Sequence, residues 1–96
     1  MTDKYNIVKA IYDDLYQTYL AKNADYGDSF GKSVRDHGLI ASLVRIGDKF
    51  NRFENLVMSG DRQMVHDESI KDTLLDLANY CVMTVAEMKE KEDDLS

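Results

Sequence analysis

Apolar residues recur at intervals of three and four positions along three long stretches of this chain, and no proline interrupts them. That interval is the repeat of one face of an α-helix, so each stretch predicts an amphipathic helix. The three helices are expected at 5–23, 39–58 and 67–88, with Asp67 as the N-cap of the last and Ser59-Gly60-Asp61 as the stop of the second. No strand-like alternation competes with this pattern, and the sequence therefore predicts an all-α fold.

The apolar positions define the helix faces that we expect to be buried. In the first helix they are Ile7, Val8, Ile11, Tyr12, Leu15, Tyr16, Tyr19 and Leu20. In the second they are Leu39, Leu43, Ile46, Phe50, Phe53 and Val57, and in the third Ile70, Leu74, Leu77, Cys81, Val85 and Met88. Cys81 is the single cysteine and has no partner for a disulfide within the chain, so we expect it to be a small buried hydrophobe.

The segment 24–38 carries three glycines and lacks helical periodicity across its length. We expect a long loop with room for one short helical turn, giving a small bundle of three main helices. Lys22, Lys32, Arg35 and His37 flank or occupy this segment, beside backbone amides that glycines can bring close to an anion. The combination suits a phosphate, and a flexible connector is the alternative interpretation.

Length and charge restrict the classes of partner. A chain of 96 residues predicts one helical domain over 1–96, with frayed ends at 1–4 and 89–96. The formal net charge of −6 argues against binding bulk nucleic acid, because neutralisation of phosphates supplies most of that affinity. No apolar run is long enough for a membrane span or a signal peptide, so we expect no membrane partner and a cytoplasmic location.

Polar side chains form a second stripe on each of the last two helices. On the third, Glu68, Asp72, Asp76 and Asn79 fall on one side of the helix. Stacked acids repel one another unless a cation lies between them, and Mg²⁺ would serve; a solvated helix face is the alternative. On the second helix, Arg45, Asp48, Arg52 and Asn55 lie opposite Phe50 and Phe53, with Lys49 nearby. Two-sided helices in so small a unit predict a homo-oligomer.

Three blocks of sequence carry a family resemblance. They are Lys22-Asn23-Ala24-Asp25-Tyr26-Gly27-Asp28-Ser29-Phe30, then 43–52 (Leu-Val-Arg-Ile-Gly-Asp-Lys-Phe-Asn-Arg), then 67–80 (Asp-Glu-Ser-Ile-Lys-Asp-Thr-Leu-Leu-Asp-Leu-Ala-Asn-Tyr). In this order they resemble the phage and prophage family called nucleotide modification associated domain 1, over most of the chain to about Val85. The resemblance implies a protein of an infected or lysogenic bacterium, in its cytoplasm.

The chain is also distantly similar to the all-α nucleoside triphosphate pyrophosphohydrolases of MazG and dCTPase type. Those enzymes hold Mg²⁺ on the triphosphate with paired acidic motifs on two antiparallel helices. Carried over, Glu68 and Asp72 match the second motif, and the first would fall at Asp48, Lys49 and Arg52, where only Asp48 is acidic. The similarity thus implies Asp48, Glu68 and Asp72 as catalytic residues, and these three with Asp76 as metal ligands.

Three functions remain open at this stage. The favoured one is a nucleotide-binding protein that needs no cofactor and sequesters a nucleotide or nucleotide-derived signal, by analogy with phage proteins that capture second messengers of bacterial immunity. Its ligand-binding residues would be Lys22, Tyr26, Lys32, Arg45, Lys49, Arg52, Asp76 and Asn79. The second is an Mg²⁺-dependent pyrophosphohydrolase. The third is a ligand-free interaction protein in which the cations of the second helix pair with the acids of the third.

Overall fold

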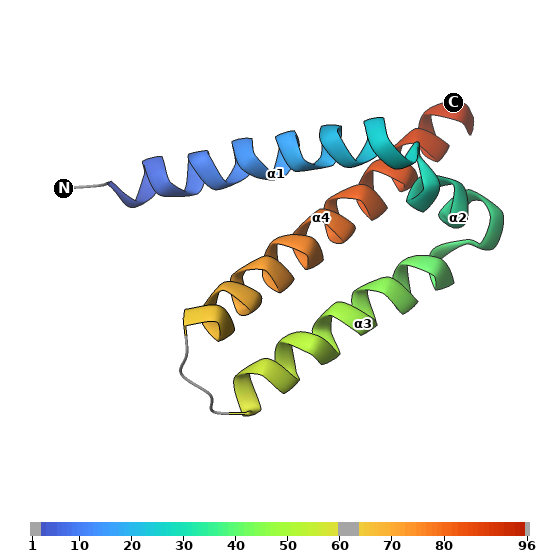
Figure 1. Cartoon of the computed structure of the whole chain (residues 1–96). Helices are drawn as coiled ribbons and strands as arrows, with labels where there is room; N and C mark the ends of the chain where they lie inside the picture. Colours follow the sequence, from blue (N-terminus) through green and yellow to red (C-terminus); the bar gives the residue numbers. More distant parts are fainter. Residues whose placement is uncertain (1–2, 60–63, 96) are drawn as a thin grey trace.

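The computed structural model describes residues 3–59 and 64–95 and consists, over these residues, of four α-helices without a strand (Figure 1). The helices are α1 (Lys4–Tyr26), α2 (Ser29–His37), α3 (Leu39–Met58) and α4 (Met64–Leu95). The all-α prediction is confirmed. None of these helices is both long enough and apolar enough to pass through a bilayer.

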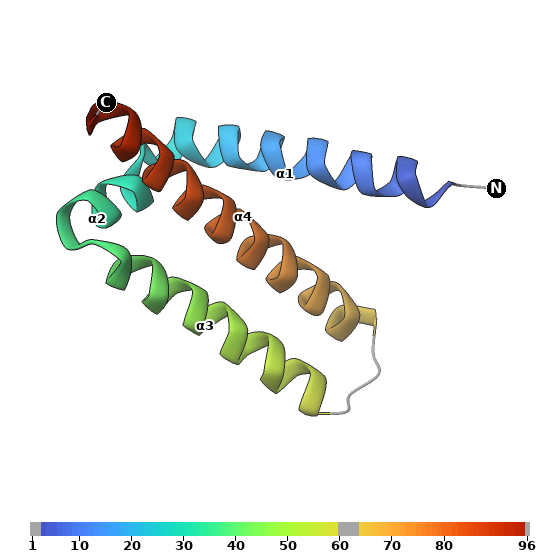
Figure 2. The same cartoon turned by 180° about the vertical axis from the view of Figure 1, so that it is seen from behind.

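The helices α3 and α4 form an antiparallel hairpin, and both views of the ribbon show them side by side (Figures 1 and 2). Polar pairs lie along the line where they touch. The hydroxyls of Ser42 and Thr84 are hydrogen-bonded at 2.9 Å, and Arg52 Nε donates to Thr73 Oγ1 at 3.2 Å. Ser42 and Thr73 are both buried, so the seam between the two helices contains satisfied hydroxyl groups.

The prediction of a long loop over 24–38 is wrong, because most of this segment is helical. The helix α1 continues to Tyr26, and α2 occupies Ser29–His37. Gly27 and Gly38 bound α2 with φ of 66° and 79°, a conformation that favours glycine. The glycine inside the helix, Gly31, is buried where a β-carbon would collide with the carboxylates of Asp28 and Glu87. The glycines therefore mark helix ends and one close approach.

The sequence did contain a signal for this helix. Phe30 and Val34 are spaced by four, and Val34 is buried. Lys32 and Asp36 have the same spacing and form an ion pair at 2.6 Å. The hydrogen bond from Lys32 lowers the pKa of Asp36.

The ends of α4 also differ from the prediction. It begins at Met64, so Asp67 is not its N-cap. An acid within the first turn is favoured by the helix dipole much as a cap is, and such a residue does not fix the first position of a helix. The helix runs to Leu95, through the charged residues beyond Met88. The stop after α3 is confirmed at Met58 and Ser59, and Gly60-Asp61 lies outside the described residues.

The described residues bury little apolar surface within one chain. Val34 is the one apolar residue classed as buried among them, at 8% exposure. The Cα radius of gyration is 15.5 Å, against about 12.5 Å expected for a compact chain of this length. The expectation that Cys81 is buried is wrong for the single chain, where it is exposed. Cys81 lies on the side of α4 away from Asn79 and hence from α1, and α1 itself buries little surface because it crosses α4 near one end and diverges from it toward the N-terminus (Figure 1).

Val34 should therefore matter more to stability than its size suggests. Val34→Ala removes two buried methyl groups and should lower the free energy of unfolding by about 1.5 kcal/mol. The matched control is Val44→Ala on α3, because Val44 is 55% exposed and its truncation should cost less than about 0.5 kcal/mol. Urea denaturation followed by circular dichroism gives both values, and equal losses would contradict the assignment of Val34 as a core residue.

Candidate functional site

A cavity of about 340 Å³ lies where the C-terminal half of α1 meets α4 and the start of α2. It joins the consecutive helices α1 and α2 to α4, which is distant from them in sequence. Its lining residues are Tyr19, Lys22, Asn23, Tyr26, Gly27, Ser29, Phe30, Asp76, Asn79, Tyr80 and Met83. Four of the predicted ligand-binding residues are among them: Lys22, Tyr26, Asp76 and Asn79.

Aromatic rings form much of the cavity wall. Phe30 of α2 and Tyr80 of α4 pack with ring centroids 5.1 Å apart and a tilt of 51°. Tyr19 and Tyr26 line it from α1, and Tyr26 is largely exposed. Rings at the mouth and wall of a cavity provide stacking surfaces for a planar ligand.

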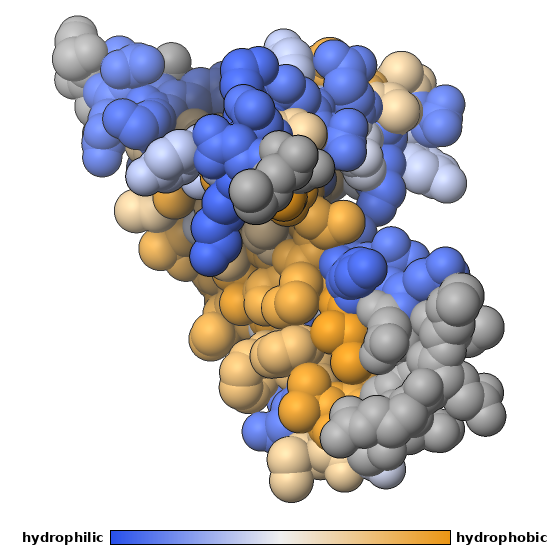
Figure 3. All heavy atoms as spheres, turned by 90° about the vertical axis from the view of Figure 1, so that its left-hand side faces the viewer, coloured by the Kyte–Doolittle hydropathy of each residue, from blue (hydrophilic) through white to orange (hydrophobic). Residues whose placement is uncertain are grey.

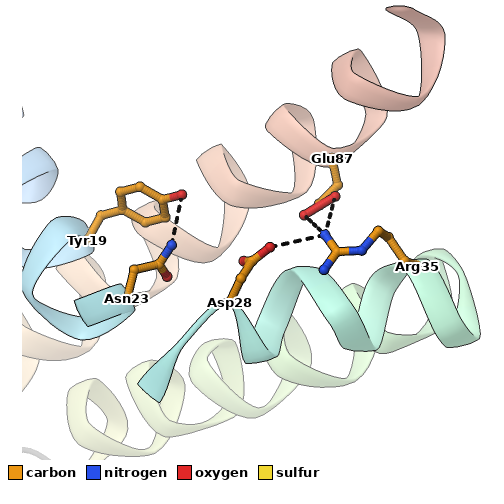
Figure 4. A network of polar contacts seen from close by, with 5 residues as sticks. All are labelled: Tyr19, Asn23, Asp28, Arg35 and Glu87. Carbon is orange, nitrogen blue, oxygen red and sulfur yellow. Dashed lines mark hydrogen bonds and ion pairs between the residues drawn. The ribbon is translucent and has the colours of Figure 1, made fainter. Parts of the chain in front are cut away.

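Two side-chain amides add hydrogen-bonding groups. Asn23 Nδ2 donates to the hydroxyl of Tyr19 at 3.2 Å, one turn away on α1 (Figure 4). Asn79 Nδ2 donates to the backbone carbonyl of Leu15 at 3.2 Å and so ties α4 to α1. Each amide also has a carbonyl oxygen that can accept from a ligand.

The charged part of the site is centred on Asp76. Lys22 Nζ of α1 lies 3.5 Å from Asp76 Oδ1, and Lys49 Nζ of α3 lies 3.0 Å from Asp76 Oδ2. Two cations thus meet one carboxylate at the wall of the cavity. The local excess of positive charge suits an anionic ligand, because an incoming phosphate can share or replace the carboxylate as the partner of the lysines.

Apart from Lys22, the cations of the prediction lie outside the cavity lining, although Lys49 contacts the lining residue Asp76. Arg52 follows Lys49 on α3 and bonds to Thr73. Arg45 is exposed one turn before Lys49 on the same helix. Lys32 is on α2, where it pairs with Asp36. The structure therefore brings together five of the predicted residues, namely Lys22, Tyr26, Lys49, Asp76 and Asn79. Arg52 lies one turn after Lys49 on α3, and Lys32 lies on α2 away from the cavity lining.

The acids assigned to catalysis and metal binding are not gathered in one place. Asp48, Glu68 and Asp72 are all exposed. Asp72 and Glu68 lie one and two turns before Asp76 on the same side of α4, while both oxygens of Asp76 bind lysines. Over the described part of the chain, no group of three or more His, Cys, Asp or Glu side chains is placed to hold a metal ion. The described residues of one chain therefore do not offer Mg²⁺ a preformed set of ligands.

Arg35 fixes α2, and with it one wall of the cavity. Arg35 Nη1 donates to Asp28 Oδ2 at 3.0 Å and to Glu87 Oε1 at 2.9 Å (Figure 4). The hydrogen bond with Asp28 raises the pKa of Arg35. The Glu87 side chain is only 11% exposed, so the ion pair with Arg35 supplies this nearly buried carboxylate with a cationic partner. Arg35 is thus engaged by two carboxylates rather than offered to a phosphate.

Several lining residues were missing from the predicted ligand-binding set, although the sequence shows that they share helix faces with residues in it. On α1 the spacing is four and then three, from Tyr19 to Asn23 and Tyr26. On α4, Asp76 and Met83 are seven residues apart, and Asn79 and Tyr80 lie three and four residues after Asp76. Such spacing places side chains on one helix face. The signal that two of these faces meet was absent, because it depends on the crossing of α1 and α4.

A comparison with protein families adds one finding. The model of the family called nucleotide modification associated domain 1 matches residues 22–88. The chain belongs to this family. The part matched to nucleotide modification associated domain 1 covers all of α2 and α3 and every cavity-lining residue except Tyr19. No curated protein and no solved structure matches the chain, so the similarity to MazG-type enzymes stays a prediction.

The role of Arg35 can be tested against a lysine on the same helix. Arg35→Met leaves Asp28 and Glu87 close together without their shared cation, so the urea midpoint of unfolding should fall clearly. Lys32→Met breaks only the exposed pair with Asp36 and should shift the midpoint little. If the two variants unfold at the same urea concentration, the Arg35 contacts do not hold α2 in place.

Proposed function

We propose that this protein binds a nucleotide or a nucleotide-derived signalling molecule in the cavity between α1, α2 and α4. The observation that carries the proposal is the convergence of Lys22 and Lys49 on Asp76 at the wall of a cavity lined by four aromatic rings. Membership in the nucleotide modification associated domain 1 family supports the same class of ligand.

Each part of the cavity has a counterpart in a nucleotide. The base would stack on Tyr26 or on the Phe30 and Tyr80 pair, a contact that every base can make. The amides of Asn23 and Asn79 would meet polar edges of the base or the sugar. The phosphates would take Lys22 and Lys49, with Arg52 one turn further along α3, and would displace Asp76 as their partner.

Binding without turnover agrees best with the placement of the acids. Hydrolysis of a triphosphate by a metal-dependent route needs several carboxylates on one ion. Asp48, Glu68 and Asp72 are exposed, and the described residues of one chain do not cluster them. We therefore propose sequestration of the ligand as the function, in the cytoplasm of an infected or lysogenic bacterium.

A ligand-free structural role is the second candidate. The specific observation in its favour is the ion pair between Lys49 and Asp76, whose side chains are 28% and 33% exposed. Such a pair joins α3 to α4 without any ligand. In that case replacement of Lys49 would lower stability and no nucleotide would raise it.

Isothermal titration with linear and cyclic nucleotides, with and without a chelator, separates these functions. We expect binding that the chelator leaves unchanged and that Lys49→Met weakens about tenfold or more, because a hydrogen bond to a charged group contributes about 1.5–3 kcal/mol. The control is Lys32→Met, which removes the same charge from α2 and should keep the affinity within about twofold, since a distant exposed charge is screened by salt. The absence of binding by any nucleotide tested would refute the proposal.

Replacement of the Asp76 carboxylate should change the nucleotide affinity in the direction opposite to replacement of Lys49. Asp76→Asn frees Lys22 and Lys49 and removes an anion next to the phosphates, so the affinity should rise several-fold at low salt. An unchanged or weaker affinity would mean that the phosphates lie elsewhere.

Pyrophosphate release that requires Mg²⁺ and is lost in Glu68→Ala and Asp72→Ala would instead establish an enzyme.

A further inference from the structure

The face of the α3 and α4 hairpin opposite α1 is apolar and uncovered in the single chain. On α3 it comprises Leu39, Leu43, Ile46, Phe50, Phe53 and Val57, and on α4 Ile70, Leu74, Leu77, Cys81, Val85 and Met88. Eight of these twelve side chains are exposed and the other four are half-buried. We call these twelve residues the hairpin face.

The two rows of the hairpin face lie on the same side of the hairpin. On α4, Asn79 contacts α1, whereas Thr73 and Thr84 contact α3. Successive residues of a helix are rotated by about 100°. By that count the six hairpin-face residues of α4, the α4 row, are centred roughly opposite Asn79 and about a quarter turn from the two threonines. The α3 row lies a quarter turn from Ser42 and Lys49 by the same count. Because the helices are antiparallel, the two rows adjoin and form one surface.

The chain exposes more surface to solvent than a compact monomer of its mass is expected to expose. The accessible surface is 7688 Å². A compact monomer of 11.0 kDa is expected to expose about 5,600 Å², so this chain exposes roughly 2,000 Å² more. An excess of that size per chain is within the range that permanent homodimers bury at their interfaces. Figure 3 shows a broad apolar area, drawn in orange, below a hydrophilic upper part.

We propose that a second copy of this chain covers the hairpin face with its own hairpin face. The two hairpins would pack face to face about a twofold axis and form a four-helix assembly. A twofold interface pairs one patch with itself, and a flat two-helix surface of apolar side chains is suited to that arrangement. None of the twelve positions carries a charge, as is typical of interface cores. The exposed apolar row of α1 lies on a single helix and so offers a narrower surface.

The arrangement leaves the nucleotide cavity free. Asp76 and Asn79 lie on the side of α4 that faces α1, away from the hairpin face. The dimer is independent of the proposed ligand, so all its tests are done without nucleotide. A failure of one proposal therefore leaves the other untouched.

Neighbouring residues of α3 provide a matched pair of variants. Leu43 is on the hairpin face and 64% exposed, whereas Val44 is off it and 55% exposed. Light scattering after size-exclusion chromatography should give twice 11.0 kDa for the unmodified protein and for Val44→Glu. Leu43→Glu should give a monomer, folded or unfolded, because it places a charge in the interface core. A monomeric unmodified protein, or a dimer that persists in Leu43→Glu, would overturn the proposal.

Cys81 gives a second measurement that needs no variant. It is the single cysteine, it lies in the α4 row, and it is exposed in one chain. In the dimer a maleimide should label it at least tenfold more slowly than in the urea-unfolded chain, and dilution should restore the rate as the dimer dissociates. Labelling of the native protein as fast as the unfolded chain at high concentration would contradict the proposed interface.

Discussion

The pairing of α3 with α4 sets the positions of the other helices and of the cavity. Its seam is polar: the hydroxyls of Ser42 and Thr84 bond to each other, Arg52 bonds to Thr73, and Lys49 pairs with Asp76. The hydrogen bond between Ser42 and Thr84 favours one register of the two helices, because a slip would take the Thr84 hydroxyl away from the buried Ser42 hydroxyl, although Thr73 and Thr84 also donate to carbonyls of their own helix. That register brings Lys49 to the same carboxylate that Lys22 reaches from α1.

The polar seam also explains why the hairpin has two faces of different character. Side chains that contact across the seam use one line on each helix, so the apolar rows point to one side and the acids of α4 to the other. The short helix α2 then packs against α4 through Arg35 and Glu87 and holds Phe30 at the cavity. Aromatic, amide and cationic groups from three helices thus meet at the one place where α1 crosses the hairpin.

Much of this could be read from the sequence, for reasons that also explain the failures. Periodicity gave three of the helices, since the repeat of apolar positions is local, and it placed Asp76 and Asn79 on one side of α4. It did not give α2, because the glycines at 27, 31 and 38 are also typical of a loop, and within nine residues they outweighed the helical spacing of Phe30 and Val34. Gly31 is inside the helix because a β-carbon there would collide with Glu87. The neighbours of Lys22 and Tyr19 depend on the crossing of α1 with α4, which no local pattern encodes.

Cys81 illustrates how a pattern can be correct in chemistry and wrong for one chain. Its row repeats every three or four residues and carries no charge, which is the composition of a buried surface, yet one copy leaves it exposed. Periodicity reports that a face avoids water and says nothing of which chain covers it. With so little apolar surface buried inside one chain, folding and association would draw on the same side chains, and the stability of this protein would depend on its concentration.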